Sequence, residues 1–349
     1  LYPNKIAFAD INLQTTYSQL VEDSKKIATN IINEKLFKEP IVLYFEKNVN
    51  LCKCIIGCNY SGNFYVVIDT SMPSDRVLSI FETLKPKLII CDDNLINTVP
   101  NNNNNIKVIS YSKAINCNIN EKLLTNCYNK IIDTDLCYAI FTSGSTGKPK
   151  GTVVNHNSLL KYLDWYIGSM KITNQTIFGG QTPFYFSGSV SDFFSTIVIG
   201  ATYHIIPKSY FMFPIKLVEF LNDRNVNTLY WVPSALAIFS ILDVFKYATL
   251  KSVCHIMFLG EVMHVKYLNY LKSYLPNCRF TNMFGPTETV DICTYYDVDR
   301  DFSLDESLPI GKHADNIDTF ILKENNTLAK IAIAFTKHLE EYATLEDTV

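Results

Sequence analysis

Features that would place a protein in several broad classes are absent from this sequence. No apolar run reaches the length of a membrane span, and no signal peptide opens the chain. Basic residues are dispersed and slightly outnumbered by acidic ones, with a net charge of -3, so no nucleic-acid-binding surface is indicated. We therefore expect neither a membrane nor a nucleic acid among its partners.

Paired cysteine motifs are also missing. The ten cysteines are scattered, and the one cluster, Cys52, Cys54 and Cys58, has neither a Cys-x-x-Cys pair nor a suitable histidine beside it. Cysteine is more often a small buried hydrophobe than a ligand, so we interpret these residues as reduced core residues of a cytoplasmic protein. The chain begins at Leu1 rather than methionine, which indicates a trimmed N-terminus or a fragment.

Apolar strand patterns alternate with helical patterns along most of the chain. This order predicts an α/β protein with two doubly wound, mostly parallel sheets that carry helices on both faces, in units of roughly 1–150 and 151–300. Thr16 and Gln19 form a capping-box pattern, and Ser74 and Asn157 are further candidate helix caps. Strands are expected at 6–8, 41–45, 64–68, 87–91, 136–141, 152–154, 203–206, 228–232, 253–258 and 279–284.

A glycine-rich loop lies between the strands expected at 136–141 and 152–154. Its glycines let backbone N–H groups approach a ligand, and its hydroxyl and ammonium groups add donors and positive charge. This inventory suits a polyphosphate, although Gly/Ser/Thr clusters also mark ordinary turns. The spacing from Gly144 to Gly147, with Pro149 after the lysine, excludes a Walker-type loop. The loop reads Thr142-Ser143-Gly144-Ser145-Thr146-Gly147-Lys148-Pro149-Lys150-Gly151.

This ordered string resembles the phosphate-binding signature of the adenylate-forming superfamily, which includes acyl-CoA synthetases, luciferases and amino-acid adenylation domains. The resemblance implies that the loop binds nucleotide and holds the leaving β- and γ-phosphates of ATP. The residues concerned are Thr142, Ser143, Gly144, Ser145, Thr146, Gly147 and Lys148.

A second motif, Asn282-Met283-Phe284-Gly285-Pro286-Thr287-Glu288-Thr289, follows the strand expected at 279–284. Taken alone, it could be a turn with a structural Thr-Glu pair. It resembles the adenine- and Mg²⁺-binding motif of the same superfamily. The resemblance implies stacking of Phe284 on adenine, a bond from Asn282 to the adenine edge, a contact of Thr287 with the α-phosphate, and Mg²⁺ ligation by Glu288.

Weaker agreements extend the resemblance from about residue 16 to residue 322. Gly260-Glu261 is similar to the glycine turn whose backbone lies against the nucleotide. Amino-acid adenylation domains are the most similar branch, including those of nonribosomal peptide synthetases and the D-alanine:carrier-protein ligases. The resemblance therefore implies the large N-terminal part of the adenylate-forming fold, residues 1–325, with the start of a β-barrel part.

The implied reaction activates a carboxylic acid, such as an amino acid or a related small acid. The carboxylate attacks the α-phosphate of MgATP and gives an acyl-adenylate and pyrophosphate. Thr142, Lys148, Thr287 and Glu288 are the expected catalytic residues. The acyl group would then pass to the thiol of phosphopantetheine on a carrier protein, or to CoA.

The expected substrate pocket departs from the pattern of amino-acid-activating relatives. In those relatives an aspartate follows the Phe of an "FD.S" segment and pairs with the substrate's α-ammonium, whereas here Ser187 occupies that position. A hydroxyl cannot neutralise a buried ammonium, so either the substrate has no α-amino group or its charge is met elsewhere. Asp291 is the candidate, with a structural aspartate as the alternative. The expected lining residues are Ser187, Gly188, Ser191, Tyr230, Met257, Leu259, Met283 and Asp291.

A second departure lies at the C-terminal end. Family members continue into a mobile C-terminal lid domain that carries a lysine bridging carboxylate and phosphate, and this sequence lacks it. Residues 327–342 instead place apolar side chains at helical spacing and predict an amphipathic helix within an unassigned tail, 326–349. Two alternatives to amino-acid activation stay open: an aryl- or fatty-acid:CoA ligase, which Ser187 favours, and a truncated nucleotide-binding remnant without turnover.

Overall fold

The computed structural model describes residues 1–100, 106–143, 149–324 and 327–334. The chain divides into two compact units. Among the described residues, the first comprises Leu1–Ala9 and Leu13–Leu160, and the second comprises Asp10–Asn12 and the residues from Lys161 onward. The change from one unit to the other after Leu160 falls inside a helix, later in the chain than the expected 150.

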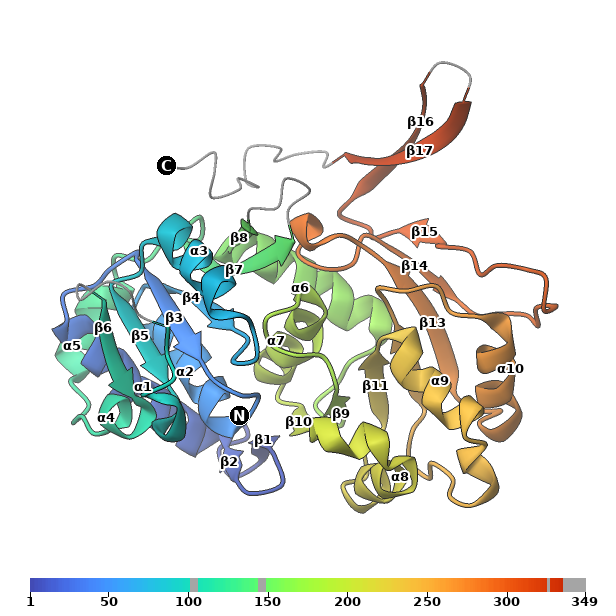
Figure 1. Ribbon diagram of the computed structural model, residues 1–349, viewed down its shortest axis with the longest axis horizontal. Helices are drawn as coiled ribbons and strands as arrows, with labels where there is room; N and C mark the ends of the chain where they lie inside the picture. The colour runs from blue at the N-terminus through green and yellow to red at the C-terminus, as the bar shows by residue number, and fades with distance from the viewer. Residues whose placement is uncertain (101–105, 144–148, 325–326, 335–349) are drawn as a thin grey trace. The chain divides into compact units, whose positions relative to one another are not determined.

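The first unit is built on a mixed sheet with strand order β6-β5-β3-β4-β7-β8, in which the β7–β8 pair is antiparallel and the other pairs are parallel (Figure 1). The central strands are apolar on both faces, as expected for a sheet covered on both sides. The strands are β3 (Pro40–Tyr44), β4 (Phe64–Ile68), β5 (Leu88–Cys91), β6 (Lys107–Ser110), β7 (Leu136–Ser143) and β8 (Pro149–Asn155). Two further strands, β1 (Ile6–Ala9) and β2 (Gln14–Thr16), pair antiparallel with each other outside this six-stranded sheet.

Helices cover the two faces of this sheet through alternate strand residues. Val77, Ile80 and Phe81 pack in one core with Val42 and Val66. Two other helices pack closely on each other, because a Cβ added to Gly57 of one would lie 2.7 Å from the side chain of Ile27 of the other. The helices of this unit are α1 (Tyr17–Asn33), α2 (Val49–Tyr60), α3 (Ser74–Leu84), α4 (Tyr111–Ile115), α5 (Glu121–Tyr128) and the 3-10 turn η1 (Asp93–Leu95).

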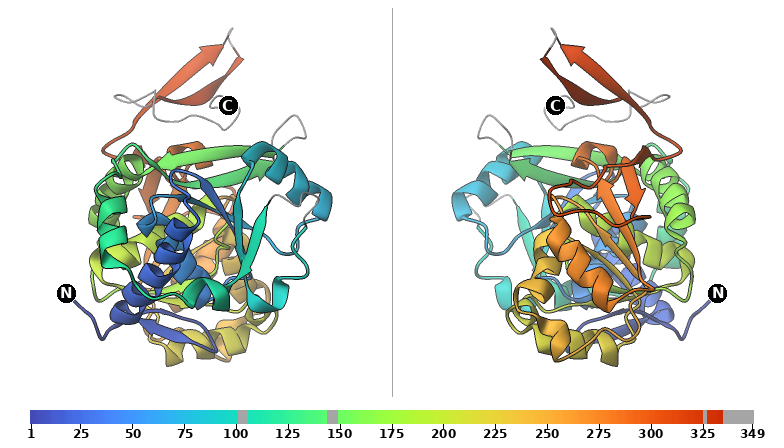
Figure 2. Two further views of the ribbon diagram at one scale, coloured as in Figure 1. Left: turned by 90° about the vertical axis from the view of Figure 1, so that its left-hand side faces the viewer. Right: turned by 90° about the vertical axis from the view of Figure 1, so that its right-hand side faces the viewer.

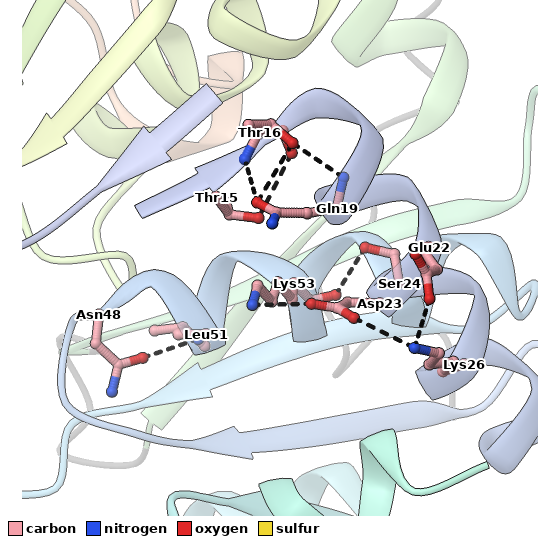
Figure 3. A network of polar contacts seen from close by, with 10 residues as sticks. All are labelled: Thr15, Thr16, Gln19, Glu22, Asp23, Ser24, Lys26, Asn48, Leu51 and Lys53. Carbon is pink, nitrogen blue, oxygen red and sulfur yellow. Dashed lines mark hydrogen bonds and ion pairs between the residues drawn. The ribbon is translucent and has the colours of Figure 1, made fainter. Parts of the chain in front are cut away.

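The start of α1 confirms the predicted capping box (Figure 3). Thr16 Oγ1 accepts the N–H of Gln19 at 3.2 Å, and Gln19 Oε1 accepts the N–H of Thr16 at 3.0 Å. The same helix is tied to α2 by Asp23, whose carboxylate lies 2.9 Å from the nearly buried ammonium of Lys53. Two other predicted caps are wrong. Pro73 precedes α3 without a side-chain bond, and Asn155 rather than Asn157 accepts the N–H of Ser158 at the start of α6.

The second unit contains a sheet whose strands run in the order β15-β14-β13-β12-β11-β9-β10. The strands from β10 to β13 are parallel, and β14 and β15 add antiparallel pairs. The strands are β9 (Ile177–Gly180), β10 (Thr202–Ile205), β11 (Thr228–Trp231), β12 (His255–Phe258), β13 (Arg279–Phe284), β14 (Thr294–Asp297) and β15 (Lys312–His313).

Helices alternate with these strands, as the sequence predicted. Apolar residues of α8, α9 and α10 share one large core with β11 and β12, and Trp231 lies at 1% exposure within it. The helices are α6 (His156–Met170), α7 (Val190–Ile199), α8 (Pro214–Asp223), α9 (Pro233–Ile241) and α10 (Val265–Tyr274), with 3-10 turns η2 (Ser187–Ser189), η3 (Lys208–Met212), η4 (Val244–Lys246) and η5 (Thr287–Thr289).

A two-stranded hairpin, red in Figure 2, follows this sheet in the chain. It pairs β16 (Asp318–Glu324) with β17 (Thr327–Ala334) in antiparallel register. The helix predicted for 327–342 is therefore wrong over Thr327–Ala334, and its remainder lies outside the described residues. Ile331 and Ile333 favour a strand, and pairing with a neighbouring strand outweighs the helical spacing of the apolar residues.

All ten cysteines are free. Seven are buried, Cys254 is exposed, and Cys117 and Cys278 are half-buried. Burial raises the pKa of the Cys54, Cys58 and Cys137 thiols. Among the residues that the structure describes, no group of three His, Cys, Asp or Glu side chains could hold a metal ion.

Candidate functional site

The glycine-rich loop is the tip of the β7–β8 hairpin in the first unit. Thr142 pairs with Lys150 and Ser143 pairs with Pro149, so the strands run up to the loop, and Thr142 is half-buried. The side chain of Ser143 and the whole of Gly144, Ser145, Thr146, Gly147 and Lys148 lie outside the described residues. The phosphate contacts expected of this loop stay a prediction.

The second motif forms a compact turn after β13 in the second unit. A Cβ added to Gly285 would lie 1.9 Å from the carbonyl oxygen of Asp291, so only glycine allows this approach of the two backbones. Cys293 N–H donates to Phe284 O at 2.9 Å and closes the turn. We name the segment Phe284–Asp291 the adenylate turn. It presents an exposed Phe284 ring, a half-buried Thr287 and an exposed Glu288.

The two residues before this turn point inward. Asn282 is buried, and its Nδ2 donates to the carbonyl oxygen of Pro309 at 2.8 Å. One amide hydrogen is thus already used, which leaves Asn282 with less capacity for an adenine edge than the sequence suggested. Met283 is 3% exposed and belongs to the interior of the unit.

Gly260 and Glu261 follow β12. Gly260 has φ +93°, a conformation that favours glycine, which fits the predicted glycine turn. The Glu261 carboxylate accepts bonds from the N–H of Ser234 at 2.8 Å and from its hydroxyl at 3.0 Å. These acceptor oxygens satisfy the first turn of α9. The nucleotide contact expected of Gly260 and Glu261 stays a prediction.

Several residues predicted to line the pocket converge on the carboxyl of Asp291, which is 0% exposed. Oδ2 of Asp291 accepts the Ser191 hydroxyl at 2.5 Å and the Tyr230 hydroxyl at 2.8 Å. Burial raises the pKa of Asp291 to about 6, and the hydroxyls of Ser191, Tyr230, Ser187 and Tyr162 oppose that rise. The structure thus brings Ser187, Ser191, Tyr230 and Asp291 together.

The other predicted pocket residues lie on the strands and turns beside this cluster. Met257 on β12 is buried, and its sulfur accepts the Tyr166 hydroxyl at 3.5 Å. Leu259 follows the same strand and would be 3.7 Å from a Cβ placed on Gly188. Gly188 therefore has room for a methyl group.

Two tyrosines of α6 were missed by the sequence prediction. Tyr162 bonds to the Ser191 hydroxyl at 2.6 Å, and its ring stacks on Tyr166, with centroids 5.9 Å apart. The Tyr166 ring in turn lies 6.3 Å from that of Tyr230. Tyr162 and Tyr166 are four residues apart and share one face of α6, which extends to Met170, and that spacing was the available signal.

Val290, the residue before Asp291, has an unusual backbone conformation. Its φ is +72° and its ψ is -58°, a combination that is rare for a β-branched residue and costs about 1–3 kcal/mol. Val290 is 1% exposed, so packing holds this conformation. The strained turn directs the Asp291 carboxyl toward Ser191 and Tyr230.

Known proteins resemble the chain over most of its length. The profile of the family described as AMP-binding enzyme matches residues 1–330. A D-alanine--D-alanyl carrier protein ligase of Bacillus cytotoxicus is 29% identical over 94% of this chain and 65% of its own length. The ligase of that name from Lacticaseibacillus casei is 28% identical over 93% of this chain and 63% of its own. The chain thus spans slightly less than two thirds of these curated relatives.

Solved structures agree on the fold. The nonribosomal peptide synthetase FmoA3, bound to alpha-methyl-L-serine-AMP, aligns with TM-score 0.83 and 19% identity over 95% of this chain and 38% of its own. The N-terminal subdomain of Klebsiella oxytoca NpsA, in complex with 3-hydroxybenzoyl-AMSN, aligns with TM-score 0.76 and 18% identity over 96% of this chain and 84% of its own. Within the described part of the chain, every helix is too short or too polar to cross a membrane.

Proposed function

The chain belongs to the AMP-binding enzyme family, and we propose that it activates a small carboxylic acid as an acyl-adenylate for transfer to a phosphopantetheine thiol. The carboxylate oxygen forms a bond to the α-phosphorus of ATP while the bond from that phosphorus to the bridging oxygen breaks. Pyrophosphate leaves. A carrier protein is the proposed acceptor, and the cytoplasm, in keeping with ten free cysteines, is the proposed compartment.

The adenylate turn is the observation that carries this proposal. Gly285 folds it against Asp291, and at the end of a parallel strand it presents a flat aromatic ring, a hydroxyl and a carboxylate. Open α/β sheets bind ligands beyond the carboxyl ends of their strands. We assign Phe284 to stacking on adenine and Thr287 to donation toward the α-phosphate.

Glu288 is the residue that would hold Mg²⁺. Its carboxylate is exposed and supplies the hard oxygen that this ion prefers. When bound, Mg²⁺ neutralises charge on the phosphoryl oxygens. The protein's own part is to orient the acid and the nucleotide and to supply hydroxyl and ammonium donors from Thr287 and from the glycine-rich loop, with Lys148 as its main cation.

Acid-dependent exchange of labelled pyrophosphate into ATP tests the proposal. Amino, hydroxy, aryl and fatty acids are assayed in parallel, together with the binding of a fluorescent ATP analogue. We expect one class of acid to support exchange. Exchange with aryl or fatty acids alone would support the alternative of an aryl- or fatty-acid:CoA ligase, which the hydroxyl at Ser187 favours. Nucleotide binding without exchange for any acid would favour the other alternative, a truncated nucleotide-binding remnant without turnover.

Lys148→Ala tests the role of the glycine-rich loop in the same assays. We expect weaker binding of MgATP and slower exchange, because the variant removes a cation from the polyphosphate. Lys122→Ala removes a charge from an exposed position of α5 and serves as the matched control. If Lys148→Ala retains both binding and exchange, the loop is only a turn.

A further inference from the structure

We propose that Cys254 and Cys278 form a reversible disulfide, so that the start of β12 and β13 is a site of oxidation by small disulfides such as oxidised glutathione. This inference goes beyond the proposed function and does not depend on it. The feature that carries it is a pair of thiols at the start of two neighbouring parallel strands, one thiol exposed and the other half-buried.

The two cysteines are neighbours across the sheet. β12 and β13 pair in parallel, with His255 opposite Arg279. The N–H of Arg279 donates to the carbonyl oxygen of Cys254 at 2.8 Å, so the pairing reaches back to the residues that precede the two strands. Neighbouring strands lie about 4.8 Å apart, and the Cα atoms of a disulfide are separated by about 4.4–6.8 Å. The backbones are therefore close enough for a bond between the two side chains.

The two side chains also belong to the same face of the sheet. Side chains alternate between the faces of a strand, so the residues that directly precede an opposed pair share the other face. Burial raises the pKa of the Cys278 thiol to about 12, and charge on Cys254 adds to the rise. The N–H of Ile256 opposes it, which places the Cys278 sulfur against the backbone of β12. The sulfur of Cys278 thus lies toward the strand that Cys254 precedes.

Small rotations complete the geometry for a bond. In the reduced protein the Cys254 thiol donates to the carbonyl oxygen of Asn227 at 3.5 Å, and the Cys278 thiol donates to that of Arg279 at 3.5 Å. A thiol is a weak donor, so little is lost when either bond is given up. Both cysteines lie just before the first residue of their strands, where the regular ladder does not yet fix the backbone.

Exposure determines the order of the chemical steps. Cys254 meets an oxidant from solvent, whereas burial keeps Cys278 protonated at neutral pH. The Cys254 thiolate attacks one sulfur of oxidised glutathione, an S–S bond forms between them, and one glutathione thiolate leaves. Cys278 then loses its proton to solvent and attacks the Cys254 sulfur, and the second glutathione thiolate leaves. Two protein thiols are oxidised, and one glutathione disulfide is reduced to two thiols.

The cysteine cluster on α2 shows why exposure matters. Cys54 and Cys58 are four residues apart on one helix, a spacing that also brings side chains together. Both are buried, and burial raises the pKa of each thiol. An oxidant in solvent reaches neither sulfur, so this pair should stay reduced under conditions that oxidise Cys254.

The proposed bond lies at the opposite end of the sheet from the adenylate turn. Cys254 and Cys278 precede β12 and β13, whereas Gly260 and Gly285 follow the same two strands. At about 3.3 Å per residue, β13 separates Cys278 from Gly285 by roughly 20 Å. Oxidation would therefore cross-link the two strands that carry these turns without adding a group to the turns themselves.

Peptide mapping by mass spectrometry tests the bond. Wild type, Cys254→Ser, Cys278→Ser and Cys117→Ser are treated with oxidised glutathione, and free thiols are blocked before digestion without a reductant. We expect wild type to give one pair of peptides joined through Cys254 and Cys278, which an excess of reduced glutathione separates again. Cys254→Ser should give no joined pair. Cys117 is half-buried in the first unit, and its variant is the matched control that should behave as wild type.

Cys278→Ser distinguishes the pair from a single reactive thiol. Without the second cysteine, glutathione should remain on Cys254, and this mixed disulfide should accumulate at least about tenfold above its level in wild type. Equal amounts of the mixed disulfide in wild type and Cys278→Ser would overturn the inference. So would a disulfide that joins two molecules through Cys254, or the recovery of both cysteines as free thiols.

Discussion

Burial of Asp291 predicts that the second unit loses stability as the pH rises through the slightly acidic range. The folded carboxyl has a pKa of about 6, against an ordinary value of 3.8 that applies to the unfolded chain. Between these values the folded state keeps a proton that the unfolded state has released, so the free energy of unfolding falls with increasing pH. The penalty is absent below the lower pKa and complete above the upper one.

The size of the effect follows from the two pKa values. A difference of about two units corresponds to roughly 3 kcal/mol. Asp291→Asn carries no titrating group at this position, so the variant should not show this loss. The stability of wild type relative to the variant should therefore fall by about 2.5 kcal/mol between pH 4 and pH 7, most of the full difference. Other titrating groups contribute equally to both proteins and cancel in the comparison.

The two tryptophans make the assay specific for the second unit. Trp165 and Trp231 are the only tryptophans of the chain, and both are buried in that unit. Urea unfolding followed by tryptophan fluorescence at several pH values gives the free energy of unfolding for wild type, Asp291→Asn and the exposed control Asp164→Asn. A difference between wild type and Asp291→Asn that does not change with pH would refute the reasoning, because it would mean that Asp291 titrates normally.

Three further substitutions test other features of the fold. Gly285→Ala would place a Cβ 1.9 Å from the Asp291 carbonyl oxygen and open the adenylate turn, so exchange should fall by about a hundredfold; normal exchange would contradict the assigned role. Gly168→Ala meets no atom within 4 Å on an exposed part of α6, and the urea midpoint should show up to about 1 kcal/mol of added stability with unchanged exchange. Thr16→Ala removes the cap of α1 and should lower the opening free energy of its amides by about 1 kcal/mol, measured by hydrogen exchange; unchanged protection would show that the cap is dispensable.

Apolar runs predicted most of the sheet strands because both faces of these sheets are covered. β4 occupies Phe64–Ile68, the range expected from its five apolar residues, all of which are buried. β14 was not predicted, since Thr294–Asp297 pairs antiparallel to β13 and carries little apolar pattern of its own. β17 was predicted as a helix because the spacing of its apolar residues fits a helix as well as a strand. Pairing with β16 is what makes this segment a strand.

Part of the candidate site could likewise be predicted from the sequence, and part of it depends on contacts between distant segments. Phe284, Gly285, Thr287 and Glu288 were identified from a contiguous motif, and they form one turn. The environment of Asp291 could not be derived locally, because its partners come from α6, α7 and β11, far apart in the sequence. Likewise, nothing near Asn282 in the sequence indicates that Pro309 takes up its amide hydrogen.

The distribution of thiols has a practical consequence for spectroscopy. A maleimide reacts with an exposed thiolate, and burial both blocks access and disfavours ionisation. Cys254 is the one exposed cysteine of the ten, whereas burial raises the pKa of Cys58, Cys137 and Cys293. Brief treatment should attach a fluorophore to Cys254 first, next to β12 and without mutagenesis. Energy transfer from the tryptophans to that dye would then follow the second unit as ligands bind.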